Sequence, residues 1–350
     1  MTPSDLLAND VPLIDLRAPA EFARGAFPNA VNRPLLTDDE RAEIGTLHKR
    51  SGRDAAMRRG HELVAGEVRD ARIKSWTDFL EQHPEARIYC WRGGLRSAIA
   101  QSWLLEAGWS VPRVEGGYKR LRQACLDVFD ALSANDRLAA GDRLAPGAES
   151  AQAKRWLVLA GRTGVGKTAV IETLPDAIDL EALAQHRGSA FGGHGSGQPT
   201  PIAFENALAI DTLKHRGSRL IVEDESRTIG RLALPQSWHA RMQQAPVVLL
   251  EAPMAERIAH IRAEYVDEPL ANGTSEAALF TRHQAALDRI KKRLGHERHA
   301  KVADALNAGF SNGNHEGWIE RLLTWYYDPM YDTPRRARRG QQRERRARCR

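Results

Sequence analysis

The sequence predicts an α/β protein with two domains, each built on a mostly parallel sheet with flanking helices. Two short apolar stretches predict it: residues 86–89 and 156–160 each lead through a glycine-rich loop into a segment with the apolar spacing of a helix. The length agrees, because 350 residues, 42% of them hydrophobic, suffice for two separate cores. The chain should therefore alternate strands and helices in both domains.

Composition and turn signals set the expected domain bounds. We expect the first domain over 1–132, a turn-rich linker over 133–154, and the second domain, with a helical C-terminal part, over 155–334. Residues 335–350 hold nine arginines and one glutamate, so this tail carries the positive charge behind the chain's net +6. Such a tail is expected to be disordered. It could attract RNA phosphates, be a solvated end or be an atypical terminus.

Composition argues against a membrane-spanning or disulfide-stabilised protein. No apolar run approaches the length of a membrane span, and the first residues lack the layout of a secretory signal. Three cysteines, at positions 90, 125 and 349, give no disulfide framework. We therefore expect a cytoplasmic protein. Cys125 lies on an apolar helical stripe and is expected to fill the core.

Four segments of the first domain have a predicted structure. A buried strand is expected at the start of residues 13–22. Within residues 25–32 a loop should lead into a second short strand. Residues 38–83 read mainly as helix, and 108–114 as a further strand. Strands that alternate with helices in this way favour a parallel sheet.

A reactive cysteine is predicted between the strand at 86–89 and the helix that follows. After Cys90 comes a loop with the composition of an anion-binding turn: Trp91, Arg92, Gly93, Gly94, Leu95, Arg96 and Ser97. Amides of a strand-to-helix turn and the N-terminus of the helix stabilise an oxyanion and favour the thiolate, the nucleophilic form of cysteine. A buried structural cysteine is the alternative, but two glycines, two arginines and a serine are poor core composition.

Several motifs of the first domain follow one another in a fixed order. They are Asp15, Arg17, Pro19, Glu21 and Phe22, then a stretch from Gly25 to Asn32, then the Cys90 loop, and then Gly116 and Gly117. Over roughly the first 125 residues this order resembles the rhodanese family, whose members carry sulfur or selenium on one cysteine as a persulfide or perselenide. The resemblance implies that Cys90 is this cysteine and that Asp15 and Arg17 support its loop.

The Cys90 loop departs from common rhodanese loops in its length. Five residues separate Cys90 from Arg96, one more than usual, and the same spacing occurs in cysteine phosphatases. A wider loop admits a tetrahedral anion, such as a phosphate ester or selenophosphate. The loop alone does not separate a phosphatase from a chalcogen transferase.

The second domain opens on a phosphate-binding motif. A strand at 156–160 is followed by Gly161, Arg162, Thr163, Gly164, Val165, Gly166, Lys167 and Thr168, and then by a helix. This matches the P-loop pattern in the strand–loop–helix context that it requires. Its glycines let the backbone wrap phosphate oxygens, Lys167 neutralises charge, and Thr168 can reach a metal ion.

Two more strands are expected in the second domain, at 219–222 and 246–250. The first ends in a polar run: Glu223, Asp224, Glu225, Ser226 and Arg227. Carboxylates at a strand tip beside a P-loop could bind Mg²⁺ or orient a ligand, so Mg²⁺ is a candidate cofactor. A solvated loop is the alternative.

Basic residues elsewhere in the second domain could face a substrate. His186 and Arg187 lie in a glycine-rich stretch over 185–199 that we interpret as a substrate loop for phosphate or RNA. Three consecutive cations could also contact RNA: Lys291, Lys292 and Arg293. A solvated position is an equal alternative for the first pair and the default for the three cations. No metal site is expected, because His296 and His299 lack a third ligand with suitable spacing.

Together the two domains resemble the bacterial tRNA 2-selenouridine synthase family, to about residue 332. The resemblance continues through four further motifs, from His186 to Gly192, Glu223 to Arg227, Arg293 to Gly295 and Tyr326 to Tyr331. The arginine tail departs from the family's usual ending, so a role of the tail in RNA binding is not carried over.

The resemblance implies a two-step reaction on 2-thiouridine at the wobble position of the tRNAs for lysine, glutamate and glutamine. A geranyl group from geranyl diphosphate first alkylates the sulfur, and selenium from selenophosphate then replaces the S-geranyl group. Lys167 and the amides of the P-loop would hold geranyl diphosphate. Cys90 would take selenium as a perselenide, with Arg92 and Arg96 holding the phosphate.

The same resemblance sets the expected partners. They are the anticodon loop of the tRNA and, as a further candidate, an enzyme that supplies selenophosphate. We expect no tightly bound cofactor, no membrane partner and a monomer. Three rival functions remain: a P-loop NTPase or kinase with a regulatory rhodanese domain, a cysteine phosphatase, and an RNA-binding protein without catalysis.

Overall fold

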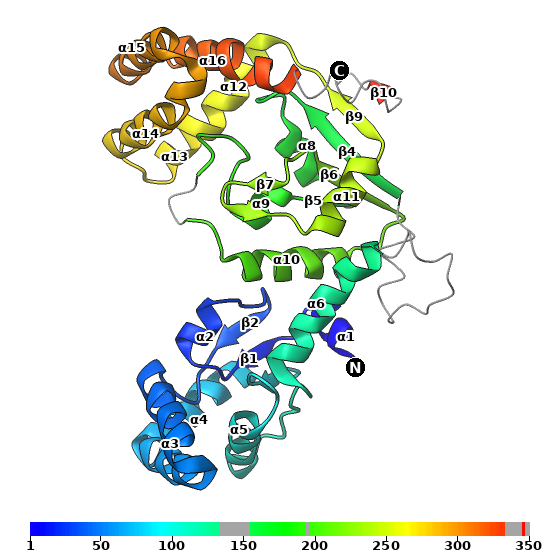
Figure 1. The fold of residues 1–350 in the computed structure, drawn as a ribbon, viewed down its shortest axis with the longest axis vertical. Coiled ribbons are helices and arrows are strands. Elements are labelled where there is room, and N and C mark those ends of the chain that lie inside the picture. Colours follow the sequence, from blue (N-terminus) through cyan, green and yellow to red (C-terminus); the bar gives the residue numbers. More distant parts are fainter. Residues whose placement is uncertain (134–154, 194–196, 333–344, 347–350) are drawn as a thin grey trace. The chain divides into compact units, whose positions relative to one another are not determined.

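The computed structural model describes residues 1–133, 155–193, 197–332 and 345–346 (Figure 1). By compactness the chain divides into two units. Unit 1 comprises Met1–Ala153 and Thr200–Arg216, and unit 2 comprises Lys154–Pro199 and Gly217–Arg350. Each unit has its own parallel sheet, which confirms the predicted α/β fold with two domains.

Unit 1 is built on a sheet of three parallel strands in the order β2-β1-β3. These are β1 (Leu13–Asp15), β2 (Ala30–Asn32) and β3 (Arg87–Tyr89). Ile14 of the central strand lies opposite Val31 and Ile88. All three residues of β1 are buried, as is usual for a parallel strand covered on both faces.

Six helices before the linker accompany this sheet. They are α1 (Pro3–Ala8), α2 (Pro19–Ala23), α3 (Asp38–Leu63), α4 (Glu67–Leu80), α5 (Leu95–Glu106) and α6 (Gly117–Ser133). Thr37 caps α3 and forms a capping box with Glu40. On α4, Trp76 is fully buried, and its indole N–H donates to the carbonyl oxygen of Arg33 at 2.9 Å.

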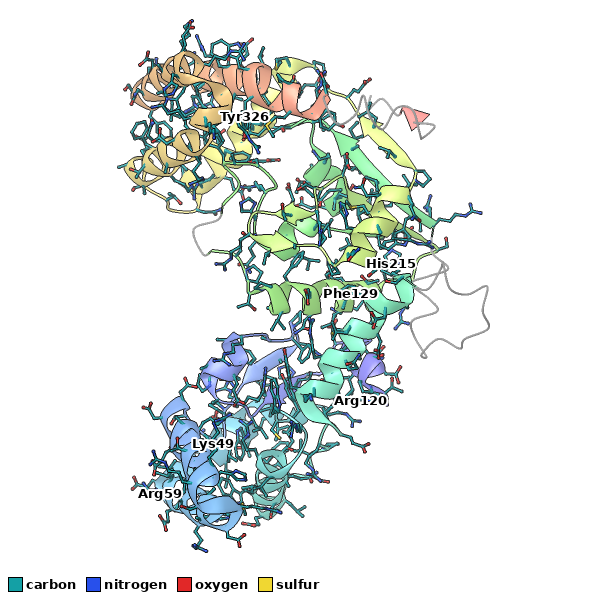
Figure 2. The ribbon with its side chains drawn as sticks, in the orientation of Figure 1. Lys49, Arg59, Arg120, Phe129, His215 and Tyr326 are labelled. Carbon is teal, nitrogen blue, oxygen red and sulfur yellow. The ribbon has the colours of Figure 1, made fainter. Side chains whose placement is uncertain are left out.

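Helix α3 is a hairpin of two helical halves. Gly52 interrupts it with φ +83°, a left-handed value that favours glycine. The two halves then lie side by side, because Arg59 donates to the carboxylate of Glu43, sixteen positions earlier, at 2.5 Å. Figure 2 shows Lys49 on the first half and Arg59 on the second.

Helix α10 (Pro201–Lys214) belongs to unit 1, although it lies within the stretch 155–334 that we expected to form the second domain. It packs against α6 and α1. The buried Asn206 donates to the carbonyl oxygen of Ala26 at 3.0 Å and accepts from Arg122 of α6 at 2.8 Å. Such long-range packing has no signal in the local sequence.

Unit 2 is built on a parallel sheet in the order β10-β9-β4-β6-β5 (Figure 1). Its strands are β4 (Arg155–Gly161), β5 (Ala177–Ile178), β6 (Arg219–Glu223), β9 (Val247–Leu250) and β10 (Arg345–Arg346). A separate antiparallel pair is formed by β7 (Thr228–Ile229) and β8 (Leu232–Ala233).

The helices of unit 2 fall into two groups. Those near the sheet are α8 (Lys167–Thr173), α9 (Leu180–Ala184) and α11 (Gln236–Gln244). The C-terminal group is α12 (Met254–Arg262), α13 (Glu268–Ala271), α14 (Glu276–Leu294), α15 (His296–Asn312) and α16 (Glu316–Leu322), with two π-helical segments, η3 (Ala263–Asp267) and η4 (Leu323–Tyr327). Residues of this second group form an apolar core of their own.

Two expectations for the backbone differ from the structure. Residues 108–114 do not form a strand: Arg113 makes a single β-bridge with Ile88, because Pro112 has no N–H with which to extend the pairing. In the tail, expected to be disordered, the backbone of β10 pairs with β9. The other residues of the tail, and nearly all of the predicted linker at 133–154, lie outside the described residues.

Cys125 is fully buried on α6, and burial raises the pKa of its thiol to about 12. It is therefore a core residue, as predicted. Within the part of the chain that the structure describes, none of the helices combines the length and the apolar character needed to span a bilayer.

The contacts of α10 make a testable prediction for stability. We expect Asn206→Ala to lower the free energy of unfolding by about 1–3 kcal/mol, because it removes the hydrogen bonds that the buried Asn206 side chain makes with the carbonyl of Ala26 and with Arg122, which keeps only its ion pair with Glu205. Urea unfolding measures the effect. Gln123→Ala, which removes an exposed contact with Asp127 on α6, is the control and should change the value by less than about 0.5 kcal/mol. Equal effects of the two variants would contradict the role given to Asn206.

Candidate active site

The Cys90 loop links β3 to α5 in unit 1. Two of its carbonyl oxygens are held by the start of α6: the amide of Tyr118 donates to the carbonyl of Cys90 at 2.9 Å, and the amide of Lys119 donates to that of Trp91 at 3.1 Å. These carbonyls therefore point toward α6. This arrangement keeps their negative ends away from an anion bound on the opposite side of the loop.

Glycines allow the loop and the turn before α6 to meet at backbone distance. Gly117 has φ +58°, and a Cβ there would collide with the carbonyl oxygen of Cys90 and the amide nitrogen of Gly93. Gly93 has φ +64°, and its Cβ would lie 2.7 Å from the carbonyl oxygen of Val114. Both positions thus require glycine, because any side chain would separate the two segments.

The thiol lies at the base of the loop. Cys90 is 3% exposed, and its Sγ is 3.4 Å from the hydroxyl of Ser97, which itself donates to the carbonyl of Gly94. Two apolar side chains of the same loop are exposed, Trp91 at 39% and Leu95 at 43%. The thiol is therefore nearly covered, whereas the side chains of Trp91 and Leu95 face solvent.

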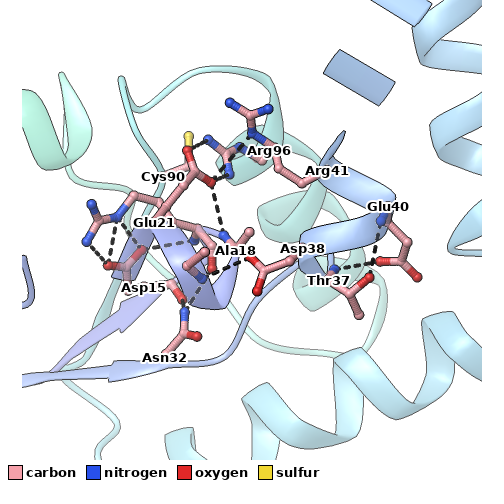
Figure 3. A network of polar contacts seen from close by, with 12 residues as sticks. Asp15, Ala18, Glu21, Asn32, Thr37, Asp38, Glu40, Arg41, Cys90 and Arg96 are labelled. Atoms are coloured by element: carbon pink, nitrogen blue, oxygen red, sulfur yellow. Dashed lines mark hydrogen bonds and ion pairs between the residues drawn. The ribbon is translucent and has the colours of Figure 1, made fainter. Parts of the chain in front are cut away.

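The predicted anion ligand Arg96 is held by a carboxylate. Its guanidinium donates to both oxygens of Glu21, at 2.6 and 3.2 Å, and Arg41 of α3 lies 3.7 Å from the same carboxylate (Figure 3). Burial alone would raise the pKa of Glu21, but the hydrogen bond and charge of Arg96 lower it below its usual value. Arg96 is thus oriented by Glu21 rather than turned freely into the loop, while Arg92 is exposed.

Asp15 and Arg17, predicted to support the loop, form a buried ion pair at the end of β1. The Arg17 guanidinium donates to Asp15 at 2.6 Å, and the hydroxyl of Tyr89, the residue before Cys90, donates to the same carboxylate at 2.7 Å. The guanidinium also lies 3.7 Å from the ring centroid of Tyr118, on which Trp91 stacks. The structure thus links this pair to both flanks of the loop.

The P-loop of unit 2 links β4 to α8. Gly164 and Gly166 have φ of +80° and +84°, values that let the backbone turn as the motif requires. The ammonium of Lys167 donates to the carbonyl of Gly161 at 3.1 Å, and the hydroxyl of Thr168 lies 3.5 Å from Glu181. Lys167 therefore lies along the loop, where phosphate oxygens would bind.

A cavity of about 210 Å³ lies over this loop. Six of the eight predicted P-loop residues line it: Thr163, Gly164, Val165, Gly166, Lys167 and Thr168. Gly161 and Arg162 do not, and the binding of diphosphate by Arg162 stays a prediction. Its guanidinium instead donates to the carboxylate of Asp332 at 2.9 Å, which holds it outside the cavity.

Two carboxylates of the predicted polar run line the same cavity: Glu223, the last residue of β6, and Glu225. Burial, and next the charge of Glu181, raise the pKa of Glu225 to about 8. Burial also raises the pKa of Glu223 well above its usual value. Its Oε2 accepts from the amide of Leu180 at 3.1 Å, whereas its buried Oε1 has no hydrogen-bond partner among the described residues.

The other members of that run lie elsewhere. The amide of Asp224 donates to the carbonyl of Leu159, while Ser226 and Arg227 are exposed, and none of the three lines the cavity. Among the described residues, no group of three or more histidine, cysteine or acidic side chains is arranged to hold a metal ion.

The basic residues predicted to meet substrate also lie outside the cavity. Arg187 pairs with Glu268 at 2.5 Å, next to Gly188, which does line the cavity. The backbone of His186 bridges to Gly193. Three exposed cations end α14: Lys291, Lys292 and Arg293.

Several residues that line the cavity were not predicted from the sequence. They are Glu181, Ser189, Glu264, Tyr265, Tyr326 and Tyr327. Glu181 lies on α9, after a two-residue strand, and belongs to no motif. Tyr326 and Tyr327 belong to a motif of the resemblance that gave them no role. Ser189 lies in the glycine-rich stretch over 185–199, which the sequence indicated as a substrate loop.

An apolar recess of about 20 Å³ adjoins the P-loop cavity. The two share part of their lining: Thr163, Ser189, Ile261, Tyr265 and Tyr327. The rest of the recess is apolar: Phe191, Trp318, Ile319, Leu322 and Leu323. Tyr265 lies in η3, and Tyr327 and Leu323 lie in η4, so both π-helical segments face the recess. Such segments are frequent at functional sites.

Comparisons with known proteins agree with this architecture. Residues 4–124 match the family model of the rhodanese-like domain, and residues 154–348 match that of the tRNA 2-selenouridine synthase AAA domain. The tRNA 2-selenouridine synthase of Marinobacter nauticus is 46% identical over 94% of this chain and 89% of its own length. Those of Shewanella pealeana and Pseudomonas syringae are 43% and 42% identical, each over 93% of this chain and 89% of their own length.

Both domain models match in the expected order, and the full-length relatives span nearly the whole chain. The chain therefore belongs to the tRNA 2-selenouridine synthase family.

Proposed function

We propose that this protein is a transferase that converts 2-thiouridine in tRNA into 2-selenouridine in two steps, prenylation of sulfur and then its replacement by selenium. The names of the relatives support the overall reaction. One observation carries the division into steps: the P-loop cavity shares part of its lining with an apolar recess. We include the tRNAs for lysine, glutamate and glutamine, recognised through the anticodon loop, in this proposal.

The P-loop holds geranyl diphosphate in this proposal. Lys167 and the loop amides neutralise the diphosphate, and the hydrocarbon chain begins at the recess beside Ile261 and Leu323, which at about 20 Å³ must widen to hold the whole chain. A nucleotide would instead place a ribose and a base beyond its phosphates, where polar partners would be expected. The apolar wall thus favours a prenyl diphosphate over ATP.

The carboxylates of the cavity must tolerate a polyanion. With its pKa near 8, Glu225 is mostly protonated at neutral pH and does not repel diphosphate. The unpartnered Oε1 of Glu223 and the hydroxyl of Thr168 are suitable oxygen ligands for Mg²⁺. A bound Mg²⁺ ion would neutralise further charge on the diphosphate.

In the first step the sulfur of the base attacks the allylic carbon of geranyl diphosphate. The carbon–oxygen bond breaks, diphosphate leaves, and the base loses its N3 proton. The P-loop stabilises the charge that develops on the departing diphosphate. Alkylation converts the sulfur into a thiolate-type leaving group, which prepares the second step.

In the second step selenophosphate delivers selenium near Cys90. A perselenide formed with release of phosphate would require selenium to lose two electrons, and the reaction includes no oxidant. We therefore propose a redox-neutral route instead of the perselenide that the resemblance implies. The Cys90 thiolate attacks C2 and expels geranyl thiolate, which takes a proton. Selenium then attacks C2 and expels Cys90, and water cleaves the selenium–phosphorus bond to give phosphate and to return a proton to N3.

This route gives each part of the Cys90 loop a role. The loop amides, Arg92 and Arg96 hold the phosphate of selenophosphate. Because Cys90 is only 3% exposed, the loop rim that carries Trp91 and Leu95 must move aside to admit the base. Ser97, 3.4 Å from the thiol, is placed to hydrogen-bond with the sulfur.

Cys90→Ala should abolish selenation and leave prenylation intact, because the thiol acts only in the second step. The measurement is mass spectrometry of nucleosides after incubation with 2-thiouridine tRNA, geranyl diphosphate and selenophosphate. The S-geranyl nucleoside should accumulate. Equal loss of both products would argue against the division, and selenation at the wild-type rate would make Cys90 dispensable, as in a non-catalytic RNA-binding protein.

Lys167→Ala should slow prenylation by about 100-fold or more, because diphosphate loses a charged partner as it departs. Chemically S-geranylated RNA should still be selenated, because that step uses unit 1. Lys301→Ala, which changes an exposed cation on α15, is the control. If Lys167→Ala instead removes an ATPase activity and leaves prenylation unchanged, the rival NTPase function is correct.

Diphosphate affinity should depend on Glu225. As pH rises from 7 to 9 through the Glu225 pKa of about 8, the carboxyl becomes charged and repels diphosphate, so wild-type affinity should fall. Glu225→Gln stays neutral and should lose less affinity over the same range. Calorimetric titration with a non-reactive geranyl diphosphate analogue measures both profiles. Parallel profiles would assign the pH dependence to another group.

A further inference from the structure

Unit 1 contains an apolar pocket of about 80 Å³ that the proposed function has not used. Its wall includes Leu35, Leu36, Ile44, Met57, Leu95 and Ile99. The pocket lies between the two halves of the α3 hairpin and the first turns of α5. It is separate from the recess of unit 2, and every residue that lines it belongs to unit 1.

The polar helix α3 forms much of the wall of this pocket. Helix α3 has one buried residue, Ala56, and it turns back at Gly52 so that Ile44 of one half and Met57 of the other face the same space. The ion pair of Arg59 with Glu43 holds the halves together from outside.

The pocket shares part of its wall with the Cys90 loop, although Cys90 itself does not line it. Leu95, Arg96 and Ile99 form its wall on the α5 side, and Ser97 in the same turn lies 3.4 Å from the sulfur of Cys90. Cys90 also packs in one apolar cluster with residues of this wall. Figure 3 shows Arg41 of α3 and Arg96 of α5 meeting at the carboxylate of Glu21, which fixes the start of α3 beside the Cys90 loop.

We propose that this pocket binds the prenyl chain carried by the sulfur of the base during the exchange at Cys90. This inference rests on the proposed function, in which an S-prenylated base must reach Cys90 and release a prenyl thiol. A chain held beside α5 directs the scissile C2–S bond toward the thiol and leaves the departing sulfur on the pocket side. Apolar contact also distinguishes a prenylated base from an unmodified 2-thiouridine.

Each anion loop then has its own apolar space. In unit 2 the chain of the prenyl donor begins at the recess, and in unit 1 the pocket takes the same chain after its transfer to sulfur. The exposed Leu95, at 43%, lies on the wall where a chain would enter. Selenation would therefore favour bases with a long alkyl group on sulfur over bases with a short one.

The test uses full-length protein, selenophosphate and two anticodon stem-loops, which carry S-geranyl-2-thiouridine and S-methyl-2-thiouridine. Wild type should bind the geranylated RNA at least tenfold more tightly and convert it faster. Met57→Trp fills the pocket and should remove this preference, while prenylation of 2-thiouridine RNA in unit 2 stays unchanged. Arg58→Trp, which places the same ring on the exposed side of α3, is the matched control.

A second variant covers the case in which Met57→Trp fails to fold. Ile44→Ala enlarges the pocket and should shift the preference from geranyl toward the longer farnesyl group, read as relative binding and conversion of the two RNAs. If wild type exchanges geranylated RNA but Ile44→Ala and a folded Met57→Trp keep the wild-type preference, the pocket has another occupant. If wild type fails to exchange prenylated RNA at all, the proposed function itself is wrong.

Discussion

The close backbone contact between Gly117 and the Cys90 loop is the constraint on which the site in unit 1 depends. A side chain at Gly117 would overlap the carbonyl of Cys90 and the amide of Gly93, so the turn and the loop meet only as bare backbone. This contact brings the first amides of α6 to the carbonyls of Cys90 and Trp91. The P-loop follows the same principle, because a Cβ at Gly164 would lie 2.7 Å from the carbonyl of Arg257. In both loops glycine allows a close backbone contact, and this contact fixes the orientation of the loop's peptide groups.

The two loops acquire different chemistry from what surrounds them. The loop of unit 1 has a thiol at its base and the Glu21–Arg96 pair at its side, which suits a nucleophile that works beside a bound oxyanion. The loop of unit 2 has a lysine, carboxyls whose pKa is raised by burial and an apolar recess, which suits the departure of diphosphate from a hydrocarbon. In the proposed reaction these two chemistries share a substrate, because the geranyl group added at the P-loop is the group expelled at the Cys90 loop.

Local sequence predicted the parts of the fold that depend on local patterns. The strand–loop–helix units around Cys90 and Lys167, and the buried Cys125, could be predicted because glycine spacing and apolar periodicity encode them directly. The strand expected at 108–114 was wrong because a single proline outweighed an otherwise suitable composition. The assignment of α10 to unit 1 could not be predicted, since it depends on packing between segments about eighty positions apart, such as Arg122 and Asn206.

The candidate sites show the same division. The loop residues were predicted from their motifs, but Glu181, Glu264 and Tyr265 reach the P-loop cavity from segments that carry no motif. Arg162 belongs to the P-loop pattern, yet Asp332 draws it outside the cavity. The two apolar spaces were invisible in the sequence, because side chains from distant helices create them only when the chain has folded.

The central claim is that selenium enters the base only after sulfur has been prenylated. It is tested most directly by following nucleosides over time, by mass spectrometry, in a reaction of wild-type protein with 2-thiouridine tRNA and selenophosphate, with and without geranyl diphosphate. The account predicts that the S-geranyl nucleoside rises and then falls as 2-selenouridine appears, and that no 2-selenouridine forms without geranyl diphosphate. Formation of 2-selenouridine at the same rate in its absence would contradict the account.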